Sequence, residues 1–433
     1  MAIASPNTDA PMVSPGSTQS YGVPLATVTT LFFMWGFLTC LNDILVPHLK
    51  SIFDLNYTKV MLIQFAFFGA YFIFSIPSAK VIDWIGYQRS MVAGLLIMGL
   101  GAFLFVPAAS VPSYPLFLGA LIVLAAGITC LQVAANPYVT VLGKPETASS
   151  RLNLTQAFNS LGTFLAPFFG GLFILTAAPN MAEIRALTPD ALQAFRVHEA
   201  ATVKMPYVGL GVALVLLAIA IGSFKLPKIE HAQHHLGEKV SDSIWKHPNL
   251  IFGAVAIFVY VGAEVSIGSF LVNYFSQPDI GGLTEKVAAS FVAFYWGGAM
   301  VGRFIGSALL QKVKTGGLLG ICAVCAAGLV TVSMLTNGHA AMYSIILVGF
   351  FNSIMFPSIF TLGVAELGPL TGDGSGVLIM AIVGGALIPV AQGWIADHIG
   401  IHHAFFLPVI CYLYILFFAL SGSKPNSERQ AKA

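Results

Sequence analysis

Two acidic residues, Asp43 and Glu264, lie well inside long apolar runs of this 433-residue chain. The other 16 of its 18 acidic residues fall in polar segments or at the ends of apolar runs. An ionised group in hydrocarbon costs roughly 2.5–3.5 kcal/mol, so such groups mark ion or substrate paths. We expect Asp43 and Glu264 to take up a proton on one side of a membrane and release it on the other. The alternative is a structural hydrogen bond, or pairing with Arg303, the one basic residue near an embedded position.

The two acids stand at matching places in their runs. Pro24 opens the apolar run that contains Asp43, and Pro248 opens the run that contains Glu264. The distance along the chain from proline to acid is similar in the two runs, so the acids lie within about one helical turn of the same depth.

Neutral polar and aromatic side chains also lie inside the apolar runs. Amide side chains both donate and accept hydrogen bonds, which suits sugar hydroxyls, and aromatic rings can stack on the apolar face of a pyranose. The alternative is that the amides join helices to one another and the rings serve packing. The expected binding residues are Trp35, Asn42, Gln64, Gln132, Asn136, Gln156, Asn159, Asn352 and Phe356; Ser160, Tyr260, Phe291, Tyr295 and Trp296 share these features.

These residues must be positioned by membrane helices. The chain is 57% hydrophobic and 9% charged, whereas a soluble domain carries about 25% charged residues. A helix needs about 20 apolar residues to cross the hydrocarbon. The sequence predicts twelve such spans, at 25–49, 60–82, 90–109, 114–138, 153–177, 206–224, 248–275, 287–310, 316–335, 340–362, 375–396 and 402–421.

The predicted fold is an all-α membrane protein with twelve transmembrane helices in two pseudo-symmetric six-helix lobes. Pro137 with Leu142-Gly143 in the fourth span, and Pro357 with Leu362-Gly363 in the tenth, repeat the same motif at the same internal spacing. Two such lobes would rock about a site near the midplane. The predicted parts are a cytoplasmic tail (1–24), an N-terminal lobe (25–224), a cytoplasmic linker (225–247), a C-terminal lobe (248–421) and a second tail (422–433).

Basic residues predict the orientation. With both termini in the cytoplasm, 14 of the 20 Lys and Arg residues lie inside and 6 lie outside, as the positive-inside rule requires. The connection 80–89 holds Asp83 and Arg89, and its counterpart at the end of the eighth span holds Arg303. We expect these charges to latch the two lobes at the cytoplasmic end; simple solvation of a surface is the alternative.

Several motifs resemble the fucose permease group of the major facilitator superfamily. They are Phe33–Phe37 leading to Leu41–Leu45, Leu62-Ile63-Gln64, Ala134–Pro137, Arg151–Leu154 and Gln156–Ser160. The resemblance runs from about residue 25 to 420. It implies two six-helix lobes and proton-coupled sugar import across the bacterial inner membrane. It also implies a proton-coupling role for Asp43, sugar binding by Trp35, Gln156 and Asn159, and a match between Arg303 and an arginine of the eighth helix.

The chain departs from the fucose carrier at four positions. Gln132, Gly268 and Phe356 stand where that carrier has glutamate, tryptophan and tyrosine, and Glu264 stands where it has glutamine. This pattern, with Leu131–Pro137, is more similar to the glucose/galactose branch. N-acetylglucosamine carriers are also near, so the sugar stays open.

The sequence thus predicts a proton-coupled monosaccharide symporter of the inner membrane, of glucose/galactose type, acting as a monomer. Alternatives are an L-fucose or N-acetylglucosamine symporter, a sodium-coupled symporter, and a sugar sensor that does not transport. Net charge of +2 argues against nucleic acid as a partner. No nucleotide-binding or hydrolase motif is present, so we expect no enzyme, cofactor or metal site.

Overall fold

The computed structural model describes residues 22–53, 57–111, 113–173, 188–202, 204–224, 226–227, 243–425 and 427. Within these helices it describes the backbone alone at 38–53, 57–62, 64, 167–173, 189, 193, 196, 199–202 and 285. The predicted linker and both predicted tails therefore lie largely outside the described residues.

The described chain is helical, with no strand among these residues. An apolar helix satisfies its own backbone hydrogen bonds, which is what a lipid environment requires. The first half contains α1 (Gly22–Phe53), α2 (Tyr57–Ser110), α3 (Tyr114–Val141), α4 (Ala148–Phe173), α6 (Pro189–Thr202) and α7 (Lys204–Ser223). The second half contains α8 (Pro248–Phe275), α9 (Glu285–Leu309), α10 (Thr315–Leu335), α11 (Gly338–Asn352), α12 (Met355–Gly363), α13 (Thr371–Met380), α14 (Gly384–Ile399), α15 (Ile401–Ala404) and α16 (Phe406–Phe417).

The twelve predicted spans correspond to these helices, with breaks that hydropathy does not reveal. α2 carries two of the spans, on either side of Gly86, whose φ of 77° is a conformation that glycine adopts at little cost. The tenth span is divided between α11 and α12, and the eleventh between α13 and α14. Nine stretches of the described residues are long and apolar enough to cross a membrane. α1 and α4, whose side chains are described only in part, are not among the nine.

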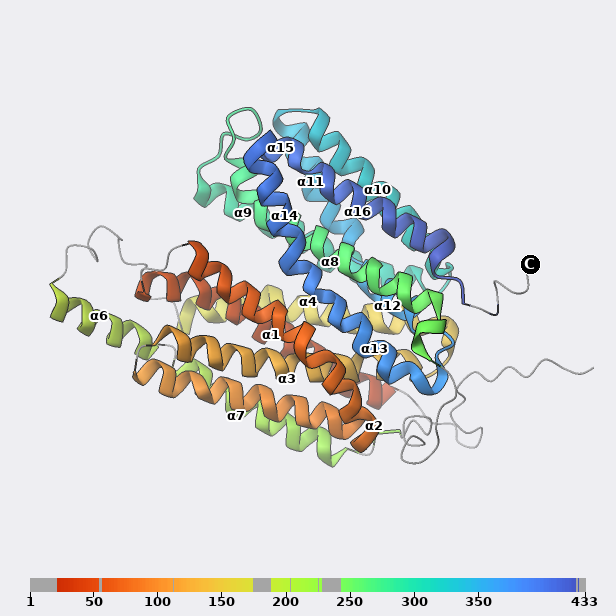
Figure 1. Cartoon of the computed structure of the whole chain (residues 1–433), viewed down its shortest axis with the longest axis horizontal. Helices are drawn as coiled ribbons and strands as arrows, with labels where there is room; N and C mark the ends of the chain where they lie inside the picture. The colour runs from red at the N-terminus through yellow and green to blue at the C-terminus, as the bar shows by residue number, and fades with distance from the viewer. Residues whose placement is uncertain are drawn as a thin grey trace, which may run out of the picture.

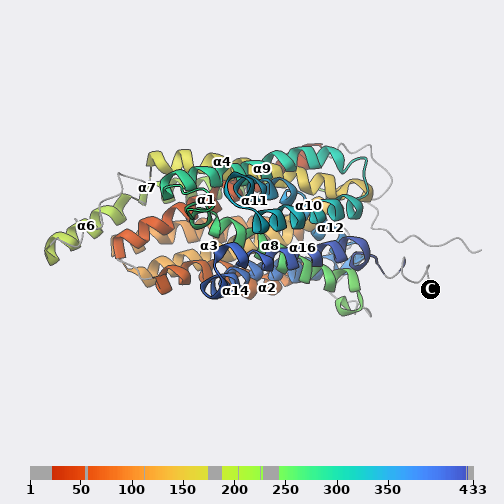
Figure 2. The ribbon, with the colours of Figure 1, turned by 90° about the horizontal axis from the view of Figure 1, so that it is seen from above.

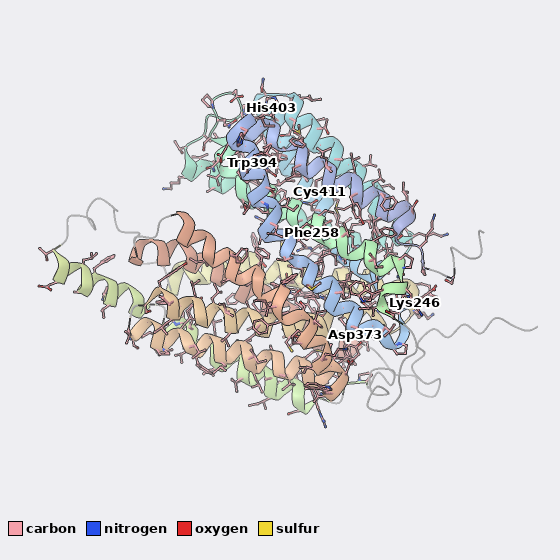
Figure 3. The ribbon with its side chains drawn as sticks, in the orientation of Figure 1. Lys246, Phe258, Asp373, Trp394, His403 and Cys411 are labelled. Atoms are coloured by element: carbon pink, nitrogen blue, oxygen red, sulfur yellow. The ribbon has the colours of Figure 1, made fainter. Side chains whose placement is uncertain are left out.

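The helices of the first half lie together on one side of the molecule, and those of the second half lie on the other (Figure 1). Seen at 90° to this view, the helices of both halves run along the same long axis (Figure 2). The halves are close at the end near the C-terminus and diverge toward the end where α6 and α15 lie (Figure 1). Asp373 lies at the end where the halves meet, and His403 lies at the opposite end of the second half (Figure 3).

A repeated glycine contact relates the two halves. A Cβ at Gly162 of α4 would lie 2.2 Å from the carbonyl oxygen of Phe33 on α1. A Cβ at Gly384, where α14 begins, would lie 2.0 Å from the carbonyl oxygen of Phe258 on α8. In each half, then, a glycine in the fifth span of that half lets its helix approach the backbone of the first span of the same half, as small residues do in membrane bundles. The contact therefore repeats between corresponding spans, as the motif of proline, leucine and glycine does in the sequence.

Candidate functional site

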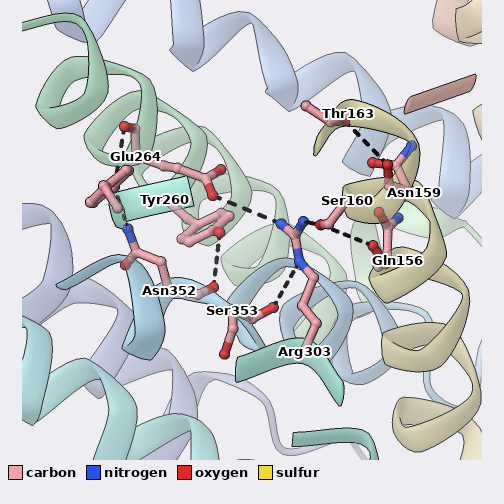
Figure 4. Close-up of polar contacts among 10 residues, drawn as sticks. Gln156, Asn159, Ser160, Thr163, Tyr260, Glu264, Arg303, Asn352 and Ser353 are labelled. Carbon is pink, nitrogen blue, oxygen red and sulfur yellow. Dashed lines mark hydrogen bonds and ion pairs between the residues drawn. The ribbon is translucent and has the colours of Figure 1, made fainter. Parts of the chain in front are cut away.

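Arg303 forms the centre of a polar cluster between the halves. Its Nη2 lies 3.9 Å from Oε1 of Glu264, and the two side chains are 14% and 13% exposed. Its Nη1 donates to Ser160 Oγ on α4, and its Nε donates to the Ser353 carbonyl at 3.3 Å. Figure 4 shows the guanidinium between Glu264 on one side and Ser160 on the other. One basic side chain therefore links an acid of the second half to a hydroxyl of the first.

The sequence left open that an embedded acid pairs with Arg303, and the structure shows such a pair. Glu264 does pair with Arg303, at a distance typical of an ion pair rather than of a hydrogen bond. Arg303 is also held from the first half, because Asn153 Nδ2 donates to its carbonyl at 2.7 Å. Pairing does not exclude a role in coupling, since a buried charge stays inside a membrane protein when a partner offsets its cost.

A network of hydroxyls and amides surrounds Glu264 within the second half. Tyr295 donates to the Glu264 carbonyl at 3.4 Å, and Asn352 Nδ2 donates to the Tyr295 hydroxyl at 2.8 Å. Tyr260 donates to the Asn352 carbonyl at 3.0 Å. The predicted binding residue Asn352 is thus held by its amide nitrogen, while its Oδ1 is buried without a hydrogen-bond partner among the described residues. The network fixes α8, α9 and α11 around the acid.

The first half holds a second group of polar side chains. Gln132 Nε2 of α3 donates to the Tyr71 hydroxyl of α2 at 2.6 Å. Asn136 and Gln156 are 0% and 5% exposed. Both amide atoms of Asn136, and Nε2 of Gln156, have no partner among the described residues. Buried polar groups are nearly always hydrogen-bonded, so these atoms call for partners that the described residues do not supply.

Asn159 joins two helices, which is the alternative to sugar binding for an amide side chain in a membrane span. Its Nδ2 donates to the Phe32 carbonyl of α1 at 2.9 Å, and Thr163 Oγ1 donates to the Gly36 carbonyl at 3.3 Å. These bonds join α4 to α1 where Gly36 and Gly162 let the backbones approach. The amide oxygen of Asn159 makes none of these contacts, so the residue positions α1 and still offers an acceptor.

The two expected aromatic binders differ in exposure. Trp35 is half-buried and packs on Phe32 with ring centroids 5.5 Å apart. Phe356 is only 9% exposed and packs on Phe360 within α12, at 6.2 Å. These contacts of Phe356 fit the packing alternative, and its predicted role in sugar binding stays a prediction.

The side chains of Asp43, Asn42 and Gln64 lie outside the described residues. Their predicted roles therefore stay predictions. The backbone places Asp43 within α1, the helix that Asn159 and Gly162 join to α4.

Hydrogen bonds between the halves gather at the end near Asp373. Lys80 Nζ lies 2.8 Å from Asp373 Oδ1 and 3.5 Å from Asp83 Oδ2. Ser149 and Thr361 hydroxyls lie 2.6 Å apart. Farther in, Ser150 donates to the Ser307 carbonyl at 2.7 Å, and Ser375 to the Val133 carbonyl at 2.9 Å. These contacts hold this end of the bundle closed.

The charged contact between the halves at this end is made by residues other than those predicted to form the latch, and the predicted latch role of Asp83, Arg89 and Arg303 stays a prediction. Asp83 lies beside Lys80, but the bond across the halves is made by Lys80 and Asp373. Arg89 is exposed, and Arg303 lies deeper in the bundle with Glu264. The sequence did not single out Asp373, because acids are common at the ends of apolar spans. Its position just before the predicted eleventh span was the only feature that could have indicated it.

Membrane-length helices in two related halves, closed at one end and built around a charged polar centre, define a two-lobed secondary transporter. The chain belongs to the Major Facilitator Superfamily, whose family model matches residues 26–382.

Similar proteins place the chain within this family. It is 53% identical over 424 residues to the "Glucose/galactose transporter" of Brucella abortus biovar 1, covering 98% of this chain and 100% of that one. It is 35% identical over 412 residues to the "L-fucose-proton symporter" of Escherichia coli, covering 93% of this chain and 94% of that one. Among solved structures, that of the transporter FucP in the outward conformation matches with a TM-score of 0.88 and 33% identity, covering 94% of this chain and all of that one.

Proposed function

We propose that this chain is a proton-coupled monosaccharide symporter of the glucose/galactose type. The observation that carries the proposal is the 53% identity, along the whole chain, to a protein named glucose/galactose transporter. The 35% identity to an L-fucose-proton symporter supports the proton as coupling ion, and makes L-fucose the second candidate substrate.

The proposed sugar site lies between the polar groups of the two halves. Asn136 and Gln156 supply unpartnered amide atoms from the first half. Glu264 and Arg303 supply charged groups from the second. Amides and carboxylates together can donate to and accept from every hydroxyl of a monosaccharide, which an apolar site could not do.

The closed end is proposed to face the cytoplasm, with both termini there and the chain in an inner membrane. The positive-inside count supports this orientation. The bonds of Lys80 with Asp373 and of Ser149 with Thr361 then form a cytoplasmic gate, and the sugar enters from the outside. A proton binding at Asp43 or Glu264 neutralises a carboxylate and allows the lobes to rearrange around the sugar.

The first experiment identifies the substrate. Purified protein in liposomes is given an inward proton gradient and a panel of radiolabelled D-glucose, D-galactose, L-fucose and N-acetylglucosamine. We expect accumulation of glucose and galactose above their external concentration, because the proton gradient drives uphill uptake. Uptake that only equilibrates, or that is lost when choline replaces sodium, contradicts proton coupling.

The second experiment tests Asp43 as the proton site. The Asp43→Asn variant should lose accumulation driven by the proton gradient, while exchange of sugar between equal internal and external pools continues. Exchange needs binding and lobe movement but no net proton transfer, so it serves as the internal control. Unchanged uphill uptake by Asp43→Asn would refute the role of this residue.

A further inference from the structure

Trp296 of α9 is a large, 41% exposed side chain next to the polar cluster. Its ring packs edge-on against Tyr295, with centroids 5.1 Å apart at 82°. Tyr295 is itself bonded to Asn352 and to the Glu264 carbonyl. An indole held this way is fixed by the network that surrounds Glu264.

The helix geometry places Trp296 on the face of α9 that meets the first half. At about 100° per residue, positions 296, 303 and 307 lie within about 40° of one another around the helix. Arg303 donates to Ser160, and Ser307 is bonded to Ser150, so this stripe faces α4. Trp296 lies about 10 Å beyond Arg303 along the stripe, toward the end where the halves diverge.

Gly268 of α8 makes the room that the indole occupies. A Cβ at position 268 would lie 2.9 Å from Cζ2 of Trp296, closer than real Cβ atoms approach other atoms. Gly268 is four residues beyond Glu264, so the two positions share a face of α8. The indole therefore lies over α8 about one turn beyond Glu264.

We propose that Trp296, seated over Gly268, is the aromatic platform on which the apolar face of a bound pyranose stacks, and that glycine at 268 is a specificity determinant. The proposal rests on the proposed sugar transport. The indole is exposed on the face of α9 that meets the other lobe, about two helical turns from the Arg303 position and over a residue one turn from Glu264. A pyranose has one apolar face that can stack on such a ring and a rim of hydroxyls that can reach the charged pair. A side chain at 268 pushes the indole from this position and changes which sugars fit.

The test uses sugar exchange at a single pH, with the half-saturation concentration and the maximal rate measured separately. Trp296→Ala should raise the half-saturation concentration about three- to ten-fold, the range expected for losing one aromatic contact, with the maximal rate little changed. Trp296→Phe keeps an aromatic face and should show a smaller rise. Gly268→Ala should raise it as well, because the new Cβ displaces the indole.

Two matched variants serve as controls. Phe294 is 63% exposed on α9 but points about 160° away from Trp296, so Phe294→Ala removes an exposed aromatic from the other face. A Cβ at Gly328 of α10 meets nothing within 4 Å, so Gly328→Ala matches Gly268→Ala in chemistry. Both controls should keep the wild-type half-saturation concentration.

The possible outcomes distinguish failure of the Trp296 proposal from failure of the proposed transport function. If the wild-type protein carries sugar and Trp296→Ala, Trp296→Phe and Gly268→Ala all keep its half-saturation concentration, the platform is wrong and the transport function stands. A fall in maximal rate alone, at unchanged half-saturation, equally overturns the platform, since it indicates a packing role. If Trp296→Ala does not fold, Trp296→Phe and Gly268→Ala decide. No uptake of any sugar by the wild-type protein refutes the transport function itself.

Discussion

Removing either partner of the Glu264–Arg303 pair should destabilise the protein strongly, and removing both should cost less than the sum of the two single losses. At 3.9 Å, two unit charges attract by about 4 kcal/mol at an effective dielectric constant of about 20. Breaking a buried pair by deleting one member typically costs about 3–5 kcal/mol, because the other charge stays buried and unpaired. The pair is only 13–14% exposed, so solvent can compensate little.

We therefore expect Glu264→Gln and Arg303→Gln each to lower the free energy of unfolding by about 3 kcal/mol. The double variant should lose less than the sum of the two, by roughly 1–3 kcal/mol, as coupled neighbours do. The measurement is a double-mutant cycle on unfolding in mixed detergent micelles, followed by a structural probe that reports helix loss.

The exposed pair at the closed end is the control for this cycle. Lys80 is 51% exposed, although its Nζ lies only 2.8 Å from Asp373, and surface pairs are worth about 0–1 kcal/mol. The cycle of Lys80→Gln with Asp373→Asn should therefore show a small coupling. If the Glu264 and Arg303 variants are additive within about 0.5 kcal/mol, the two side chains do not form a pair in the folded protein and this reasoning fails.

Two further predictions test the closed end and the helix contact. In a Ser149→Cys/Thr361→Cys variant, oxidation should form a disulfide across the halves, since the two hydroxyls lie 2.6 Å apart; transport should stop and return with a reductant, and oxidised protein that still transports at the wild-type rate would contradict a gate that must open. Gly162→Ala should lower thermal stability in detergent by several degrees, because its Cβ would lie 2.2 Å from the Phe33 carbonyl oxygen and overpacking costs roughly 1–3 kcal/mol. Gly119→Ala, where a Cβ meets nothing within 4 Å, should not, and equal losses at both positions would refute the close contact.

The spans could be predicted from the sequence because each is a long apolar run, and a lipid environment leaves such a run little choice but a helix. The bends could not. Gly86 has a φ of 77° while α2 continues on both sides, and the break between α11 and α12 falls inside an apolar run. Hydropathy averages over about one span, so it does not register the backbone conformation of a single residue.

The candidate site was predictable in its members but not in its contacts. The polar residues inside apolar runs could be named, and Glu264, Arg303, Gln156 and Asn352 are among them. Which of them touch depends on the rotation of each helix about its axis. The Arg303 bond to Ser160 joins positions 143 residues apart, and Lys80 and Asp373 are 293 apart. The contact of the Trp296 indole with Gly268 likewise depends on how α8 and α9 pack against each other.

Arg303 could connect the proposed ion coupling to the movement of the halves, because it contacts residues of both. Its guanidinium holds Glu264 from its own half and Ser160 from the other. When Glu264 is charged, it draws the guanidinium toward α8; when Glu264 is protonated, that attraction is lost and the bonds toward α4 and the Ser353 carbonyl remain. We propose that the charge state of this carboxylate changes the balance of contacts between the lobes. A ligand shifts a two-state equilibrium only by its differential affinity for the two states. In this proposal a proton bound at Glu264 has that difference, because its partner Arg303 also contacts Ser160 of the other lobe. This is why the pair, rather than the acid alone, is the unit to perturb.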